Sequence, residues 1–358
     1  MRRSGAVLVL AVIVTVVALL SQPALADARE YYPVEVAVDG SGNVYVMMGS
    51  GSSDPGIYVY APDGALKKYY PGEEYADLAI DGAGNLYLSN IRKGQVELKP
   101  ANGSPRIFWR EDTPGRFIDY IAAARDGTLY VTDFNVTDNP AASVGGRILK
   151  IGPDGAIRDV IEGSPELPMT IQFKLSVSDN GTVYLADSGV SVGAIYPDGG
   201  RSSITPAGVE NGRADRLVDV AAGGDGYLYV TESTGGYVLK LAPDGRVMTK
   251  WDGCGPMRFA TPFGVAVDGQ GRVYVTDMLN QRVVWFDGDR YRFGDDASEN
   301  VAGKGLLWDY VMDAGNVTAP PIPGYPIVPP HGMPGYTFII AIVCLCLAGL
   351  LTCLRGRI

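Results

Sequence analysis

The chain has 358 residues, of which 30 are basic and 40 acidic, and 46% are hydrophobic. This composition indicates an ordered chain, long enough for one large domain or two small ones. Its single histidine, His331, excludes a histidine-dependent catalytic triad, a histidine-bound zinc and a haem held by two histidines. The 47 glycines and 24 prolines favour many tight turns over long helices.

The N-terminus has the three parts of a secretory signal peptide. Two arginines at positions 2 and 3 precede an apolar run over residues 6–20, and Ala24-Leu25-Ala26 forms a small-x-small cleavage site. The pattern predicts a signal peptide over residues 1–26 and export of the mature chain. An uncleaved N-terminal anchor is the alternative.

A repeated unit organises residues 27–296. A phrase of the type Val-Asp-Gly-x-Gly-Asn-Val-Tyr-Val occurs six times, and its tyrosines are spaced by 42, 43, 54, 45 and 45 residues: Tyr45, Tyr87, Tyr130, Tyr184, Tyr229 and Tyr274. Each unit combines a strand, a glycine-rich turn and a second strand, and four units add a Pro-Asp-Gly turn further on. This period predicts an all-β, six-bladed β-propeller with four strands in each blade.

Closure of the predicted ring has two candidates. Residues 29–32 are expected to add a closing edge strand, and residues 305–312, within a segment at 297–318, are expected to pack against the rim.

The repeats resemble NHL repeats. The sixth unit carries most of that pattern in Pro262-Phe-Gly-Val-Ala-Val-Asp268, Gly271-Arg-Val-Tyr-Val-Thr-Asp277 and Asn280-Gln-Arg282, with glutamine where the family has its eponymous histidine. The first two units keep the hairpin, and the third to fifth keep mainly the turn and the tyrosine. The resemblance implies a six-bladed propeller with a binding role.

A more distant resemblance is to gluconolactonase-like propellers, which hold a divalent cation on the axis through carboxylates and asparagines. Those enzymes have asparagine twelve positions before the repeat tyrosine, and this chain has none at that position in any unit. The resemblance therefore implies hydrolase chemistry only if other residues replace those ligands.

Ten positions before the repeat tyrosine, where each inner strand is expected to begin near the mouth of the channel, four units have a charged residue, the third has a tyrosine and the sixth a glycine. The candidate ligand or channel residues are the charged residues, that tyrosine and the aspartate before it: Glu35, Asp77, Asp119, Tyr120, Lys174 and Asp219. Three carboxylates that converge on an axis repel one another unless a cation or Lys174 compensates them. One hypothesis is a metal site at Glu35, Asp77 and Asp219 for Ca²⁺ or another divalent cation. The other is a solvated acidic rim with Lys174 as counter-charge. No residue is assigned a catalytic role.

A second set of acids follows three positions after the tyrosine: Asp133, Asp187, Glu232 and Asp277. We expect these carboxylates to accept backbone N–H bonds and to fix the turn that follows the second strand.

The C-terminal region is predicted to tether the domain. Residues 319–335 form a proline-rich linker, residues 336–354 an uncharged transmembrane helix, and residues 355–358 a basic cytoplasmic tail. Pro334-Gly335-Tyr336 followed by an apolar run and arginines resembles archaeal tripartite sorting signals, which begin Pro-Gly-Phe. This resemblance implies that the helix is either a sorting signal that is removed or an ordinary membrane span.

Location and charge limit the partners. Residues 27–335 retain 26 of the basic and all 40 acidic groups, a net charge of −14, so nucleic acid is not an expected partner. Cys254 is the only cysteine outside the apolar C-terminal segment, so no internal disulfide is expected there. The acceptor pattern for N-glycosylation occurs at Asn102, Asn135, Asn180 and Asn316.

Two functions follow from these features. The first is an NHL-type binding or scaffolding module for an extracellular protein or glycan, tethered to the outer face of the cytoplasmic membrane. The alternative is a metal-dependent hydrolase or lactonase that uses the axial carboxylates.

Overall fold

The computed structural model describes residues 32–287, except for residues 50–51, 53–54, 73–74, 136–145, 168, 170–172, 208–215 and 255–256. All of these belong to one compact unit, Arg29–Ala314. The predicted signal peptide, the segment at 297–318, the linker, the C-terminal helix and the basic tail lie outside the described residues, as does His331. Within the described ranges, no helix is long and apolar enough to cross a membrane.

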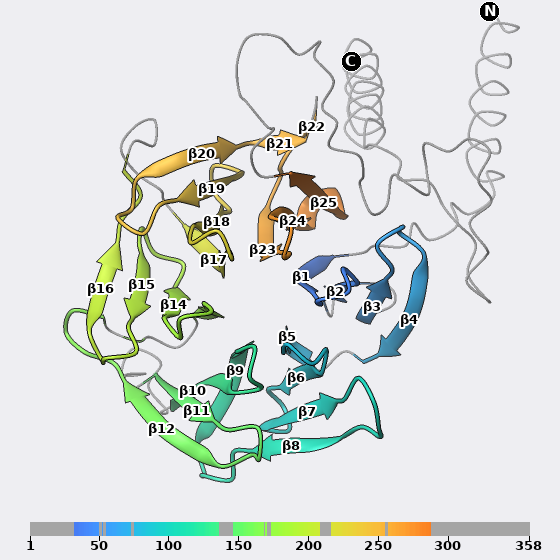
Figure 1. Ribbon diagram of the computed structural model, residues 1–358, viewed down its shortest axis with the longest axis vertical. Helices are drawn as coiled ribbons and strands as arrows, with labels where there is room; N and C mark the ends of the chain where they lie inside the picture. Colours follow the sequence, from blue (N-terminus) through green and yellow to red (C-terminus); the bar gives the residue numbers. More distant parts are fainter. Residues whose placement is uncertain are drawn as a thin grey trace, which may run out of the picture. The chain divides into compact units, whose positions relative to one another are not determined.

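Six antiparallel sheets follow one another around a common centre, which confirms the six-bladed propeller (Figure 1). In each blade the strands pair in chain order, with the first strand innermost. Blades one and two consist of β1 (Pro33–Val38), β2 (Val44–Met48), β3 (Gly56–Tyr60) and β4 (Leu66–Pro71), then β5 (Tyr75–Ile80), β6 (Leu86–Asn90), β7 (Gln95–Lys99) and β8 (Arg106–Arg110). Blade three consists of β9 (Arg116–Ala123), β10 (Leu129–Asn135), β11 (Arg147–Ile151) and β12 (Ile157–Glu162).

The remaining blades repeat this order. Blade four contains β13 (Lys174–Val177), β14 (Val183–Ala186), β15 (Val192–Ile195) and β16 (Arg201–Ile204). Blade five contains β17 (Leu217–Ala222), β18 (Leu228–Glu232), β19 (Tyr237–Leu241) and β20 (Val247–Trp251), and a small β21 (Gly253–Cys254) and β22 (Met257–Arg258) hairpin follows it. Blade six contains β23 (Pro262–Val267), β24 (Arg272–Asp277), the short 3₁₀ helix η2 (Met278–Asn280) and β25 (Arg282–Asp287).

The repeated phrase in the sequence is a locked hairpin between the first two strands of a blade. In blade two, one Asp81 oxygen accepts the N–H groups of Ala83 and Asn85, each at 2.9 Å. The other oxygen accepts the Asn85 side-chain amide at 2.8 Å and the Tyr87 hydroxyl at 3.1 Å. A single carboxylate thus satisfies four donors of one tight turn, which explains why aspartate, asparagine and tyrosine recur together.

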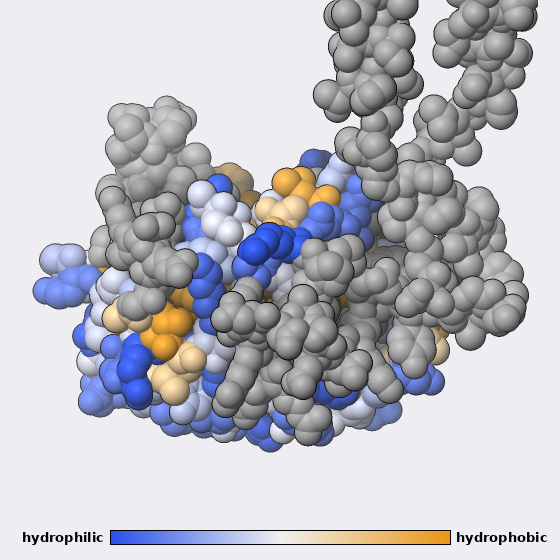
Figure 2. Space-filling model, turned by 90° about the horizontal axis from the view of Figure 1, so that it is seen from above, coloured by the Kyte–Doolittle hydropathy of each residue, from blue (hydrophilic) through white to orange (hydrophobic). Residues whose placement is uncertain are grey.

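Hydrophobic packing lies between the blades. Each of the six clusters of buried apolar side chains in the described residues joins two neighbouring blades. Between blades five and six, for example, the fully buried Trp251 packs against Phe286, with ring centroids 4.7 Å apart. No blade buries both faces alone, so the ring is the unit of stability. The outer strands are exposed, and the side of the ring in Figure 2 is mainly hydrophilic with small hydrophobic patches.

The ring closes where β1 packs on β23. Gly264 is essential to this contact, because a Cβ atom there would lie 2.9 Å from the Glu35 Cα and 3.0 Å from the Val34 carbonyl oxygen. Tyr32 belongs to blade one, since its carbonyl accepts the Gly49 N–H at 2.8 Å. The rest of the predicted closing strand at 29–32 lies outside the described residues, and in the described part blade six has three strands.

Candidate axial site

The six inner strands surround a cavity of about 170 Å³ on the axis of the ring, and its charged residues lie at the end where these strands begin, which we call the upper end. Residues from all six inner strands line it, and four of the predicted site residues are among them: Glu35, Asp77, Lys174 and Asp219. The structure therefore brings together groups that lie up to 184 positions apart in the chain. Their exposed fractions are 4–6%, so the predicted solvation of an acidic rim is wrong, because the charges are buried where the blades converge. The other part of that hypothesis, Lys174 as the counter-charge, is confirmed by its ion pairs with Glu35 and Asp219.

A β-bulge at the start of the inner strands helps to direct these side chains. In blades one, two and five the pairing with the second strand shifts by one residue just before Glu35, Asp77 and Asp219. A bulge leaves one residue unpaired and re-aims its neighbours. Each of these carboxylates accepts the backbone N–H of the residue that follows it, at 2.8–2.9 Å.

Asp77 and Asp219 each connect two blades. The second oxygen of Asp77 in blade two accepts the N–H of Ile121 in blade three at 2.8 Å. In the same way, Asp219 in blade five accepts the N–H of Val265 in blade six at 2.9 Å. Both oxygens of each carboxylate thus accept a backbone N–H, one from its own blade and one from the next blade. We call these two residues clamps, because each one connects two neighbouring blades.

Lys174, the first residue of β13, holds the only positive charge that the described residues place in the lining of this cavity. Its ammonium forms an ion pair with Glu35 of blade one and lies 3.6 Å from a carboxylate oxygen of Asp219. It also lies 4.9 Å from the centre of the Phe263 ring and 5.7 Å from that of Tyr120. Neighbouring carboxylates and aromatic faces both stabilise an ammonium ion.

Three carboxylates share this one ammonium, and the pKa values of Asp77 and Asp219 show the conflict. Burial and the charge of Glu35 raise the pKa of Asp77 well above its usual range, although Lys174 opposes them. Burial raises the pKa of Asp219 to about 7 against the same opposing charge. Burial alone would lower the pKa of Lys174, but Asp219, Glu35 and Asp77 outweigh it and raise that pKa. We infer that Asp219 is partly protonated near neutral pH while Lys174 stays charged.

Asp119 and Tyr120 do not line the cavity but lie beside it on β9. The Tyr120 N–H donates to the Thr132 hydroxyl at 2.8 Å. Burial raises the pKa of Asp119 to about 7, and Lys174 opposes the shift. None of the described residues donates a hydrogen bond to the Asp119 carboxylate.

The residues do not fit a divalent cation. Calcium takes six to eight oxygen ligands, but the oxygens of Asp77 and Asp219 already accept backbone N–H groups, and Glu35 binds Lys174. No group of three or more Cys, His, Asp or Glu side chains in the described ranges is arranged to hold a metal. The proposed ligand set Glu35, Asp77 and Asp219 is instead arranged around an ammonium, and the Ca²⁺ hypothesis stays a prediction for titration.

The acids three positions after the repeat tyrosine accept backbone N–H groups in three blades, but they fix the predicted turn in only two of them. The Asp187 carboxylate accepts the Gly189 N–H at 3.0 Å and Glu232 accepts the Thr234 N–H at 3.3 Å, both within the turn after the second strand. Asp277 instead accepts the N–H of Ala260, at 2.9 Å, from the segment before β23. Asp133 differs, because its carboxylate binds the guanidinium groups of Arg116 and Arg147 at 2.7 and 2.6 Å. The prediction of backbone partners is wrong for Asp133, although its role is also structural.

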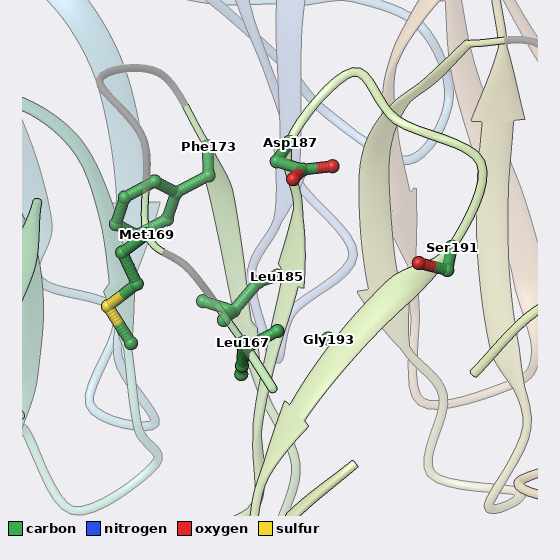
Figure 3. Close-up of a pocket in the computed structure, with 7 residues that line it drawn as sticks. All are labelled: Leu167, Met169, Phe173, Leu185, Asp187, Ser191 and Gly193. Atoms are coloured by element: carbon green, nitrogen blue, oxygen red, sulfur yellow. The ribbon is translucent and has the colours of Figure 1, made fainter. Parts of the chain in front are cut away.

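A second cavity lies in blade four and is too small for a substrate. It measures about 30 Å³, room for about one water molecule, and its walls include Leu167, Met169, Phe173 and Asp187 (Figure 3).

The four candidate glycosylation sites differ in solvent exposure. Asn102 and Asn180 are exposed, Asn135 ends β10 and is partly buried, and Asn316 lies outside the described residues. Glycosylation stays a prediction for all four.

Sequence reasoning missed Phe263 and the backbone groups that bind the axial acids. Phe263 stands eleven positions before its repeat tyrosine, directly before the position that was singled out. A bulge in β23 shifts the register between Pro262 and Val265. The repeat pattern in the sequence does not predict this shift.

Solved structures share this fold at low sequence identity. A virginiamycin B lyase from Staphylococcus aureus is 16% identical, with 74% of this chain and 86% of that chain covered and a TM-score of 0.50. A calcium-binding regucalcin from Agrobacterium tumefaciens is 14% identical, with 69% and 82% covered and a TM-score of 0.51. A gluconolactonase from Xanthomonas campestris is 16% identical, with 69% and 84% covered and a TM-score of 0.52.

These likenesses show a shared propeller fold. No protein-family model and no curated protein matches the chain. Function therefore has to be argued from the site.

Proposed function

We propose that this chain is a cell-surface-tethered propeller of the NHL type that binds an extracellular protein or glycan and does not catalyse a reaction. The observation that carries the proposal is the state of the axial groups. Asp77 and Asp219 are bound by backbone N–H groups of two blades, and Lys174 is paired with Glu35. A metal, a general base or a nucleophile at the predicted axial residues would need at least one of these groups to be available to substrate.

The absence of histidine supports the same proposal. A solved variant of the S. aureus virginiamycin B lyase, in which alanine replaces one histidine, is described as catalytically inactive. Residues 27–296 of this chain contain no histidine at all, so lyase chemistry of that kind lacks a required group. The tether is supported by the signal-peptide pattern at 1–26 and the apolar segment at 336–354.

We assign binding to the upper face of the ring, where the inner strands begin and the loops between second and third strands lie. Among the described residues, three large apolar side chains are exposed there: Phe117 by 39%, Val190 by 42% and Leu279 by 59%. Burying an exposed apolar side chain against a partner is favourable, so these residues are probes of binding at this face. Ile157 and Met248, exposed by 48% and 42% on the outer strands β12 and β20, are matched controls away from this face.

The test is binding of the purified protein to cell envelopes of the organism that makes it. We expect saturable binding that persists in EDTA and that is weakened at least tenfold by Val190→Ser combined with Leu279→Ser. Ile157→Ser combined with Met248→Ser should leave it unchanged. Protease treatment of the envelopes removes a protein partner, and periodate oxidation removes a glycan partner. No saturable binding, or equal losses in both double variants, would refute the assignment.

The second candidate is a metal-dependent hydrolase or lactonase. Its support is the likeness to a gluconolactonase and the buried Asp119, whose raised pKa suits a general acid or base. The test is hydrolysis of a panel of sugar lactones with added Ca²⁺, Mg²⁺ or Zn²⁺. Turnover that EDTA abolishes and Asp119→Asn lowers at least a hundredfold would establish this candidate and overturn the first.

A further inference from the structure

We propose that the upper end of the axial channel is an ammonium-binding site that the chain fills with its own Lys174. Lys174 thereby becomes the point at which all six blades meet. This inference concerns how the ring is held together and does not depend on what the upper face binds.

The ammonium of Lys174 is surrounded by side chains from the whole ring. Lys174 belongs to blade four, and each of the other five blades presents one side chain to it. Direct contacts come from Glu35 and Asp219, aromatic rings from Tyr120 and Phe263, and a further carboxyl group that interacts electrostatically with the ammonium from Asp77. Blades one and four are opposite in a ring of six, so the pair of Lys174 with Glu35 spans the channel.

The neighbours of the ammonium combine carboxyl groups with aromatic rings. Two ring faces within 6 Å favour an ammonium group through the ring quadrupole. A small divalent ion instead requires a shell of oxygens, which the two rings do not supply. We therefore expect the site to bind an organic ammonium ion more tightly than Ca²⁺ or Mg²⁺.

The stability of this buried site depends on the presence of a cation. Lys174, Glu35, Asp77 and Asp219 are each 4–6% exposed. Removing one partner of a buried ion pair leaves an uncompensated charge and is strongly destabilising. Lys174→Ala should therefore lower the melting temperature by about 10 °C.

The same substitution creates the test of selectivity. Replacing lysine by alanine removes three methylene groups and the ammonium, which together have the shape of n-propylammonium. In about 50 mM n-propylammonium chloride, Lys174→Ala should regain about 4 °C if the amine binds with a dissociation constant of about 5 mM. Equal concentrations of sodium or tetramethylammonium chloride should restore less than about a quarter of that shift. The wild-type protein in each salt is the control for general effects of the amine.

Metal ions provide the opposing outcome. We expect no shift in the wild-type melting temperature between EDTA and millimolar Ca²⁺ or Mg²⁺. Rescue of Lys174→Ala by Ca²⁺ below the concentration at which the amine acts would show a metal site and overturn the proposal. Rescue by sodium as large as that by the amine would overturn the selectivity.

A measurement on the unaltered protein covers the case in which Lys174→Ala does not fold. Acetic anhydride labelling followed by mass spectrometry compares Lys174 with Lys68, which is exposed on β4. Lys174 should react at least a hundredfold more slowly in the folded protein and at the same rate after unfolding. Equal reactivity of the two lysines in the folded protein would show that Lys174 is not the buried central cation.

Discussion

Asp77→Ala tests whether the axial acids act as clamps between blades. The substitution removes the acceptor for two buried backbone N–H groups, those of Leu78 at 2.8 Å and of Ile121 at 2.8 Å. Each buried donor left without a partner costs about 1–3 kcal/mol, so the gross loss is about 2–6 kcal/mol. Loss of the unfavourable charge beside Glu35 offsets part of this. We expect a net decrease of about 3 kcal/mol in the free energy of unfolding.

The assay is equilibrium unfolding in guanidinium chloride at pH 7, followed by tryptophan fluorescence. Asp198→Ala is the matched control, because the Asp198 carboxylate accepts one N–H, that of Gly200, in an exposed turn. Water can replace that acceptor, so the control should lose less than about 1 kcal/mol. Hydrogen exchange of the Ile121 amide should accelerate in Asp77→Ala and stay slow in the control. Equal stabilities for the two variants, or an unchanged Ile121 exchange rate, would refute the clamp.

Three further predictions concern pH, closure and the hairpins. Because the folded state holds Asp219 with a pKa of about 7 and the unfolded chain releases that proton near pH 4, stability should decrease as the pH rises from about 4 to 7. Asp219→Asn should flatten this decrease in urea titrations across that range, and an unchanged slope would contradict the raised pKa. Gly264→Ala should destabilise the ring by about 3 kcal/mol because its Cβ meets the backbone of blade one, whereas Gly269→Ala, with open space around it, should change thermal stability little. Asp81→Ala should cost about 3 kcal/mol by removing the acceptor of four hairpin donors, and Tyr87→Phe about 1 kcal/mol; a smaller loss for Asp81→Ala than for Tyr87→Phe would show that the carboxylate does not organise the turn.

The number and type of blades could be predicted because each blade contains the same short sequence pattern. Each blade repeats one hairpin, and the hairpin depends on residues within seven positions of one another, such as Asp81, Asn85 and Tyr87. A count of the repeats therefore predicts the number of blades. The same alignment placed Glu35, Asp77, Lys174 and Asp219 at equivalent positions, and the structure brings these four residues to one cavity.

The state of these residues could not be predicted from the pattern. Whether Asp77 meets solvent, a metal or the Ile121 N–H depends on the packing of blade two against blade three, and these groups lie 44 positions apart. The bulges that aim the acids have no distinct residue preference, and Phe263 reaches Lys174 through such a shift. Burial of the charged groups likewise follows from closure of the whole ring, which no single repeat encodes.

The central claim is that the positive charge on the axis is the chain's own Lys174. A crystal structure of the protein grown with Mn²⁺, recorded at a wavelength where manganese scatters anomalously, tests it directly. The prediction is an ordered Lys174 side chain whose ammonium lies within hydrogen-bond distance of the Glu35 carboxylate, and no anomalous peak within the axial cavity. An anomalous peak bound by Glu35, Asp77 and Asp219, with Lys174 turned away, would contradict it and would favour the metal-dependent hydrolase.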